Sequence, residues 1–462
     1  MAPRIALALF AVGIVGLNYL DRDRESKTSP AIWFAVAWFF LGASRNLSQW
    51  LVRGPRLISA DQYLEGNPVD RLILSGLIVV AIVVLFNRVP RTSRLLQKNG
   101  VILLFFVYCL LSVVWSDFPL VALKRWTKAL GNLAMVMLVL TDRNPAAALK
   151  RLFARTGFLL VPLSLLVIKY YPDYGRGYLP FTWEVSFTGV SSDKNGLGVI
   201  CLICGLVSLW LFTDAYRDKQ RANRSGSMLA HGTVLVMIAW LLHLANSSTA
   251  LACLGLGSAL LLMTTRSGKP STVNRLTLLI ICGALFGYVF PDVYDSVVHL
   301  LGRNPDLTGR TDIWNDVLKM HINPLLGTGF ESFWLGSRVE YMWSKYIFHP
   351  NQAHNGYIEM YLNLGWIGVT LLAAQFLVGY RNVVDAFRRK MVSAPFRLSL
   401  LVVATVYNMT EAAFKVMHPM WIAFLFAVMA VPEAPPAQTQ TITASEWPVT
   451  TEETEPRLLA SS

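Results

Sequence analysis

The sequence contains a long series of apolar stretches, and most of them approach the roughly 20 residues that a helix needs to cross a bilayer. We count about thirteen, give or take one. They cover residues 4–20, 30–47, 72–87, 100–115, 125–141, 156–170, 196–213, 229–245, 249–265, 276–290, 357–379, 395–410 and 417–431, of which 30–47 and 417–431 are marginal. Barrel strands would be shorter and alternating. The pattern therefore predicts an all-α, polytopic helical membrane protein with roughly 12–13 transmembrane helices.

The chain of 462 residues carries a formal charge of +13, which raises the question of a nucleic-acid partner. Twenty-one of the 41 Lys and Arg residues lie in alternate loops: Arg22, Arg24, Lys27, Arg88, Arg91, Arg94, Lys98, Arg143, Lys150, Arg151, Arg217, Lys219, Arg221, Arg224, Arg266, Lys269, Arg275, Arg381, Arg388, Arg389 and Lys390. By the positive-inside rule these loops face the cytoplasm. The charge is thus an orientation signal, and we expect no nucleic-acid partner.

The longest connection between spans is 291–356, on the opposite, outer side. Loops of this length are usually functional. We therefore divide the chain into N-terminal transmembrane helices (1–290), a long outer loop with amphipathic helices (291–356), C-terminal transmembrane helices (357–432) and an acidic tail (433–462), for which we expect disorder on the cytoplasmic side.

Two residues of the long loop are candidates for chemistry. Arg310 precedes an amphipathic stretch, so that its guanidinium and a helix N-terminus can point at one phosphate. The alternative is that Arg310 caps a loop or pairs with Asp306 or Asp312. His354 stands just before a span, where it can accept a proton from a sugar hydroxyl near neutral pH, or else only hydrogen-bond a backbone carbonyl.

Further cations lie at outer ends of spans. Lys194 is placed where positive-inside logic disfavours a cation, although it could simply snorkel to lipid headgroups. Lys124, Arg125 and Lys128 can gather lipid-linked phosphates or contact headgroups. Glu411, near the outer end of the penultimate span, either pairs with one of these cations or faces water.

Three motifs are set aside. Asp21-Arg22-Asp23 lies on the basic side, Cys201-x-x-Cys204 sits inside an apolar helix, and Gly327-Thr-Gly329 lacks the lysine and context of a phosphate loop. The outer face shows no His/carboxylate cluster with metal-ligand spacing. We expect a metal-independent mechanism without a cofactor.

The motifs in 302–368 and 193–195 together resemble the O-antigen ligase/polymerase superfamily. They read Gly302-Arg303, Leu307-Thr-Gly-Arg310-Thr, Ile313-Trp314, Pro324-Leu-Leu-Gly-Thr-Gly-Phe330, Phe333-Trp334, Ala353-His-Asn-Gly-Tyr357 and Leu364-Gly-Trp-Ile-Gly368, with Asp193-Lys194-Asn195 upstream. The last element makes the chain most similar to the exopolysaccharide repeat-unit polymerases. One departure is Ser247-Ser248-Thr249, where the family often has a cation; Lys194, Arg176 or Arg125 are candidates to replace it.

The resemblance implies a C-type membrane glycosyltransferase at the outer face of the bacterial inner membrane. Its partners would be an undecaprenyl-diphosphate-linked oligosaccharide, an acceptor glycan, membrane lipids and a chain-length regulator. Arg310 and His354 would be catalytic. Lys194, Asn195, Asn355, Arg303, Arg125, Lys128 and Arg176 would bind substrate.

The favoured activity is polymerisation or transfer of lipid-linked repeat units by attack of a sugar hydroxyl, with diphosphate leaving. An O-antigen ligase that passes glycan to lipid A core shares the donor chemistry. A lipid-linked oligosaccharide flippase or transporter is the third reading, and it predicts charged residues along the spans near the bilayer midplane.

Overall fold

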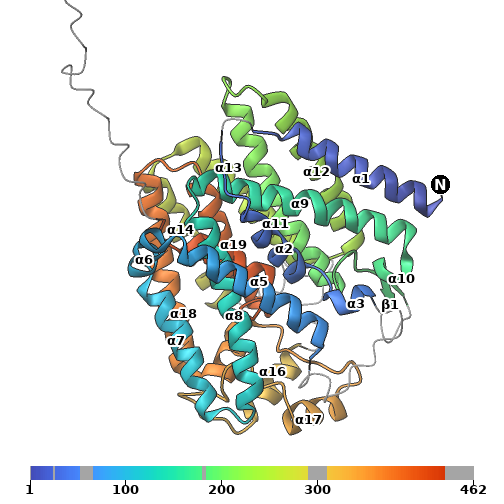
Figure 1. Ribbon diagram of the computed structural model, residues 1–462. Helices are drawn as coiled ribbons and strands as arrows, with labels where there is room; N and C mark the ends of the chain where they lie inside the picture. The colour runs from blue at the N-terminus through green and yellow to red at the C-terminus, as the bar shows by residue number, and fades with distance from the viewer. Residues whose placement is uncertain (1, 24–25, 52–65, 179–183, 290–309, 432–462) are drawn as a thin grey trace, which may run out of the picture.

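The computed structural model describes residues 2–23, 26–51, 66–178, 184–289 and 310–431, of which the side chains of 280–289 are not described. Helices make up nearly all of this part (Figure 1). In the first half they are α1 (Pro3–Leu20), α2 (Ile32–Ala43), α3 (Leu47–Leu51), α5 (Pro68–Phe86), α6 (Val89–Lys98), α7 (Gly100–Leu111), the 3-10 turn η1 (Ser112–Trp115), α8 (Pro119–Leu140), α9 (Pro145–Tyr170) and α10 (Pro172–Gly175).

A small antiparallel hairpin follows, formed by β1 (Arg176–Tyr178) and β2 (Val185–Phe187), with Gly177 opposite Ser186. The remaining helices are α11 (Lys194–Arg217), α12 (Arg224–Ala245), α13 (Ser248–Ser267), α14 (Pro270–Val289), α16 (Arg310–Lys319), α17 (Ser337–Lys345), α18 (Gly356–Arg388), α19 (Ala394–Thr410) and α20 (Pro419–Val428). Helix α11 packs along α12, and α19 packs against both α13 and α18.

The protein is an all-α, multi-pass membrane protein. Seven helices of the described part are long and apolar enough to cross a bilayer, namely α1, α5, α9, α11, α12, α13 and α18. An eighth results if α6 and the apolar helix after it count as one span bent by 87°. The expected total of roughly 12–13 spans also counts the shorter apolar helices of the described part, α2 and α20 among them. The two marginal stretches, 30–47 and 417–431, form helices of only 12 and 10 residues, α2 and α20.

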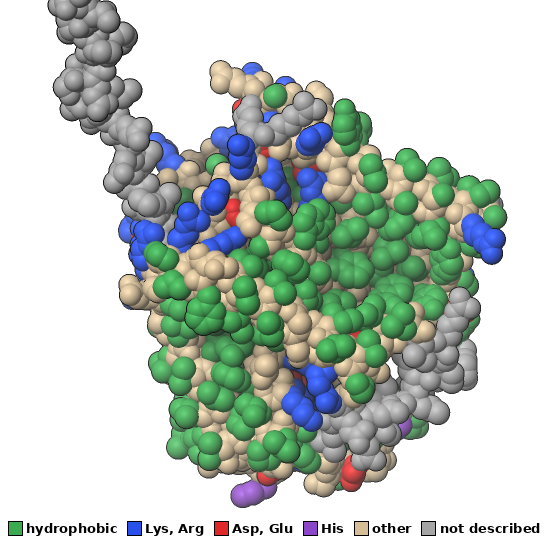
Figure 2. All heavy atoms as spheres, in the orientation of Figure 1, with side chains coloured by type: hydrophobic (Ala, Val, Ile, Leu, Met, Phe, Trp, Pro, Cys, Tyr) green, Lys and Arg blue, Asp and Glu red, His purple; other side chains and the backbone are tan. Residues whose placement is uncertain are grey.

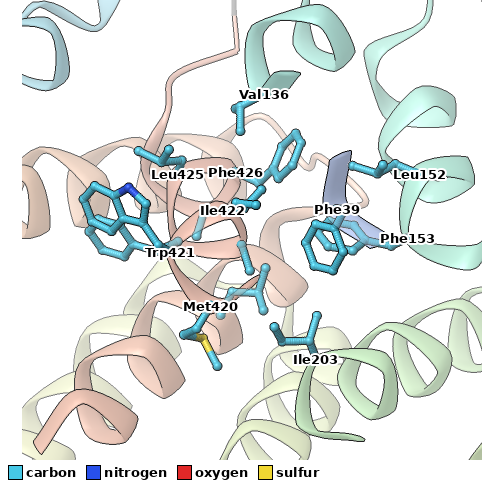
Figure 3. Close-up of a cluster of buried hydrophobic side chains, with 14 of the residues drawn as sticks. Phe39, Val136, Leu152, Phe153, Ile203, Met420, Trp421, Ile422, Leu425 and Phe426 are labelled. Atoms are coloured by element: carbon cyan, nitrogen blue, oxygen red, sulfur yellow. The ribbon is translucent and has the colours of Figure 1, made fainter. Parts of the chain in front are cut away.

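Helix α20 is apolar because it lies inside the protein, whereas α2 buries one side and leaves Trp33 and Phe34 exposed. All ten residues of α20 are buried. Figure 3 shows side chains of α20 meeting side chains from α2, α8, α9 and α11. At the centre, the ring of Phe153 lies 5.6 Å from that of Phe39 and 5.5 Å from that of Phe426, edge to face. A strongly apolar run can thus belong to a protein core and not to a lipid-facing span.

The C-terminus of α20 is capped by a buried arginine. Arg397 of α19 is 2% exposed, and its guanidinium donates hydrogen bonds to the carbonyls of Ala427 and Met429. A helix leaves its last carbonyls without partners and carries partial negative charge there. The arginine satisfies both demands and allows so short a helix to end inside the core.

The basic loops that the structure describes contact one another at one end of the molecule, which we call the basic face. Asp142 accepts a hydrogen bond from the backbone of Ser29 at 3.0 Å and lies 3.7 Å from Arg88, and Lys150 pairs with Asp214 at 2.6 Å. Figure 2 shows Lys and Arg side chains gathered at this end, with a broad hydrophobic band below them. The alternation of charge along the sequence therefore corresponds to one face of the fold.

The connections at the other end form what we call the loop face, made of residues 44–51, 112–118, 171–178, 184–193, 310–355 and 411–418. Helices α16 and α17 lie here (Figure 1). The predicted amphipathic helix is confirmed: α16 buries Ile313 and Val317 in a small separate core with Phe333 and Leu362. This core fixes the long loop onto α18.

Helix α18 is broken at Gly365, which has φ +61° and ψ −165°. The loop of Pro324–Gly329 fills the break. The backbone nitrogens of Trp366 and Ile367 donate to the carbonyls of Pro324 and Leu325 at 2.9 and 3.3 Å. A Cβ atom on Gly365 would lie 2.2 Å from the Leu325 carbonyl oxygen. The Pro-Leu-Leu-Gly-Thr-Gly and Leu-Gly-Trp motifs thus form one packing unit.

We predict that Gly365→Ala destabilises the protein, because a left-handed backbone costs a non-glycine residue about 1–3 kcal/mol and the added Cβ collides with backbone. Gly255→Ala is the matched control, since a Cβ at this α13 glycine meets nothing within 4 Å. The midpoint of thermal unfolding in detergent should fall for Gly365→Ala and stay level or rise for Gly255→Ala. Equal midpoints for both variants would contradict this role of the break.

Candidate active site

The carboxylate of Glu411 lies at the centre of the polar contacts on the loop face. Glu411 follows the last residue of α19 in extended conformation, and its side chain is 8% exposed. A buried carboxylate needs hydrogen-bond donors or positive charge around it. Three side chains from distant parts of the chain supply them.

Arg310 Nη2 donates to Glu411 Oε1 at 2.9 Å, and Nη1 donates to the carbonyl oxygen of Thr410. Asn195 Nδ2 donates to the same Oε1 at 3.1 Å. His354 Nδ1 lies 3.3 Å from Oε2. Two predicted catalytic residues and one predicted binding residue therefore meet on a single carboxylate. Arg310 pairs with Glu411. Of the two partners weighed above, Asp312 forms no ion pair with it among the described residues, and Asp306 lies outside them.

Each of these side chains stands at the start of a helix. Arg310 is the first residue of α16. Asn195 is the second residue of α11, whose N-cap Asp193 accepts from the Gly196 backbone nitrogen at 2.9 Å. The loop before α11 is held by Arg45, which donates to the Gly189 carbonyl oxygen at 3.0 Å.

His354 has a left-handed backbone, with φ +50°, and Asn355 after it is the N-cap of α18. The Asn355 amide oxygen accepts from the nitrogens of Tyr357 and Ile358, and its Nδ2 donates to the Met409 carbonyl oxygen at 3.1 Å. Asn355 was expected to bind substrate. Both the oxygen and the nitrogen of its amide are hydrogen-bonded within the protein. Asn355 thereby holds the neighbouring His354 imidazole between α18 and the end of α19.

The charge state of Glu411 follows from these neighbours. Burial raises the pKa of the carboxyl, but the hydrogen bond from His354 and the positive charge of Arg310 outweigh it, and the pKa falls below its ordinary value. An ionised carboxylate can only accept hydrogen bonds. The proton of the His354 imidazole is therefore on Nδ1, where it faces Glu411, and Nε2 is left for other chemistry.

The other predicted cations lie at varying distances from this cluster. Lys194 is next to Asn195 at the start of α11, half-buried and without an ion pair within the described residues. Arg125 of α8 donates to the carbonyl oxygen of Glu331, and Lys128 lies one turn further along α8. Arg303 lies outside the described residues.

Arg176 is not brought to the cluster. It begins β1, where it donates to the Ile168 carbonyl oxygen at 2.9 Å and covers the ring of Phe187 at 5.8 Å. These contacts tie the hairpin to the end of α9. By contrast, the turn that lacks the family's cation lies at the cluster, because Thr249 Oγ1 is 3.1 Å from Thr410 Oγ1.

The motifs that the sequence analysis set aside have structural roles. Cys201 and Cys204 are buried, unpaired thiols of α11. Asp21 of the basic face accepts from Ser227 at 2.7 Å. Gly327 and Gly329, with φ +69° and +94°, belong to the loop that fills the break in α18. In the part of the chain that the structure describes, no three His, Cys, Asp or Glu side chains are grouped so that they could hold a metal.

Comparison with known families agrees with this geometry. Residues 232–373 match the family described as O-antigen ligase, a range that contains both Arg310 and His354. This part of the chain is thus similar to the O-antigen ligase family. Residues 62–169, which include Arg125 and Lys128, match a family of unknown function, DUF5935. No curated protein matches the chain.

Sequence reasoning identified the donors but not their common acceptor. Glu411 was considered only as a residue that pairs with some cation or faces water, and its partner could not be chosen. The one signal was an acidic residue at the end of an apolar span, on a face with several cations. Its distance in sequence from Arg310, Asn195 and His354 hid the contact, which only the packing of α19 against α13 and α18 creates.

We predict a pH-dependent contribution of Glu411 to stability. Because its pKa is lowered in the folded protein, the stabilisation is present above the ordinary value of 4.5 and is lost as the pH falls. Glu411→Gln should lower the midpoint of thermal unfolding at pH 7. The difference in midpoint between the variant and wild type should become smaller toward pH 4. Glu340→Gln, an exposed carboxyl of α17, is the control and should change little. A difference in midpoint that does not change with pH would argue against an ionised Glu411.

Proposed function

We propose that the protein transfers a glycan from undecaprenyl diphosphate to a hydroxyl of an acceptor sugar, as a repeat-unit polymerase or a ligase. The match of residues 232–373 to the O-antigen ligase family supports a ligase/polymerase activity of the glycosyltransferase type. The observation that carries the residue assignment is the shared carboxylate: Arg310 and His354, which the two halves of the reaction require, both contact Glu411.

Arg310 serves the leaving group. As the glycosidic bond to phosphate breaks, negative charge grows on the diphosphate, and a guanidinium stabilises it through paired hydrogen bonds. The arginine is also the first residue of α16, a helix of ten residues whose free N–H groups carry partial positive charge. For this role Arg310 exchanges its contact with Glu411 for one with the diphosphate.

His354 serves the attacking hydroxyl. Its Nδ1 proton faces Glu411, which leaves the Nε2 lone pair to take the hydroxyl proton. The oxygen of the hydroxyl forms a bond with the anomeric carbon of the donor. The bond between that carbon and the phosphate oxygen breaks, and the electron pair leaves with the diphosphate. A single displacement of this kind inverts the anomeric centre.

The remaining predicted residues supply binding. Lys194 and Asn195 at the start of α11 lie closest to the cluster, and Arg125 and Lys128 lie further along the loop face. In the proposal these cations compensate for the one missing at Ser248 and perform the charge neutralisation that metals provide in other transferases. Arg303 and Arg176 remain candidates for more distant contacts with the lipid-linked donor.

The proposed setting is the bacterial inner membrane, with the basic face in the cytoplasm and the loop face in the periplasm. The distribution of Lys and Arg supports this orientation. Partners would be the lipid-linked oligosaccharide, the acceptor glycan, the surrounding lipids and a chain-length regulator.

Polymerase and ligase differ only in the acceptor. Purified lipid-linked repeat units, supplied alone, should give longer lipid-linked chains if the protein is a polymerase. Transfer only after lipid A core is added would identify a ligase.

We predict that Arg310→Ala and His354→Ala abolish polymer while the amount of protein in the membrane stays normal. Arg310→Lys should remain strongly impaired, because an ammonium cannot form the paired hydrogen bonds of a guanidinium. His321→Ala, an exposed histidine of the same loop, is the control and should make polymer of normal length. The polymer made by cells is measured on gels, and the amount of each variant in the membrane is measured in the same cells. Normal polymer from both alanine variants would refute the assignment.

A further inference from the structure

A cavity of about 170 Å³ lies on the loop face beside His354. Its walls come from the start of α8, the loop 330–334, the first turns of α18 and the loop after α19. One residue connects it to the histidine: Lys415 Nζ donates to Gln352 Oε1 at 2.6 Å, and Gln352 Nε2 lies 3.4 Å from His354 Nδ1. A ligand in this cavity would therefore contact Gln352, the neighbour of the imidazole.

The cavity carries charges of both signs. Arg125 and Lys415 are its cations and Glu331 is a carboxylate in its wall, while the buried carboxyl of Glu359 already accepts from the Trp334 indole and the Ala353 backbone nitrogen. A diphosphate would be repelled by the Glu331 carboxylate. A neutral ligand with many hydroxyls suits the set, because a hydroxyl both donates to carboxylates and accepts from cations and amides.

Aromatic side chains form part of the apolar lining of the cavity. Trp334 and Phe330 contribute aromatic surface. The Trp334 indole is fixed by its Nε1, which donates to Glu359 Oε1 at 2.8 Å. Ligand sites commonly combine apolar and aromatic walls with a few well-placed polar groups. The C–H faces of a sugar ring are apolar while its rim is polar, as such a site requires.

Glu331 has one carboxylate oxygen held by the protein and one that a ligand can reach. It has a left-handed backbone, with φ +53°, and its Oε1 accepts from the Val416 backbone nitrogen at 3.0 Å. Within the described residues no hydrogen bond reaches its Oε2. The volume would hold on the order of ten water molecules, or one sugar ring of about a dozen non-hydrogen atoms.

We propose that this cavity binds a sugar residue of the acceptor glycan, with Glu331 and Lys415 as its hydrogen-bonding groups. The inference rests on the proposed function, since it places the acceptor beside the base His354 and leaves the diphosphate on the side of Arg310. Beyond the proposed function, the inference names Glu331 and Lys415 as residues that select the acceptor.

The test is direct binding of the repeat-unit oligosaccharide, released from its lipid and freed of phosphate, to the full-length protein in detergent. Isothermal titration calorimetry gives the Kd. No lipid-linked donor is present, so binding is measured without turnover. Glu331→Gln and Lys415→Gln keep the side-chain shape closely and should each weaken binding about tenfold, the usual effect of losing a hydrogen bond to a charged group.

Glu340→Gln and Lys319→Gln alter the same charges on exposed positions of α17 and α16 and should bind as wild type does. Thermal midpoints confirm that the variants are folded. In the transfer assay, the cavity variants should raise the KM for acceptor and leave the KM for donor unchanged.

Three results would overturn the proposal: no binding of the oligosaccharide to wild type, equal Kd values for cavity and control variants, or displacement of the oligosaccharide by inorganic diphosphate. Failure of the proposed function is a separate outcome, recognised by full transfer activity in His354→Ala whatever the binding data.

Discussion

The arrangement of the loop face depends on the buried carboxylate of Glu411. A buried negative charge is stable only when donors and cations compensate it. Here the donors come from the starts of α11 and α16 and from the residue before the N-cap of α18. One carboxylate thereby fixes the relative positions of three helix ends. It also gives Arg310 and His354 a common partner, which sets the protonated nitrogen of the imidazole.

The scaffold makes this convergence possible through two unusual helices. Helix α20 is short and entirely buried, and Arg397 satisfies its last carbonyls. Helix α18 is interrupted at Gly365, and the loop 324–329 fills the gap. Both features bring the long loop and the end of α19 close to the ends of the spanning helices, so that the loop face is part of the packed structure.

The helical, membrane-spanning character of the chain could be predicted because both signals are local: apolar stretches and the alternation of basic loops. The short, buried helix α20 could not, because an apolar stretch that is buried in protein has the same composition as one that is buried in lipid. Arg310, His354 and Asn195 were predicted from their positions before helices and from motif resemblance. Glu411 as their shared partner depends on packing between segments far apart in sequence, and so does the binding of Arg176 to the end of α9. Such long-range contacts leave no periodic pattern in the sequence.

The central claim is that the cluster around Glu411 breaks the bond to diphosphate, and the most direct test is release of undecaprenyl diphosphate. Liposomes containing the purified protein and a lipid-linked repeat unit should release it in step with growth or transfer of glycan, and liposomes with the Arg310→Ala protein should not. A flippase would move the lipid-linked oligosaccharide across the bilayer with the diphosphate linkage intact. Translocation without released undecaprenyl diphosphate in the wild-type liposomes would contradict the account.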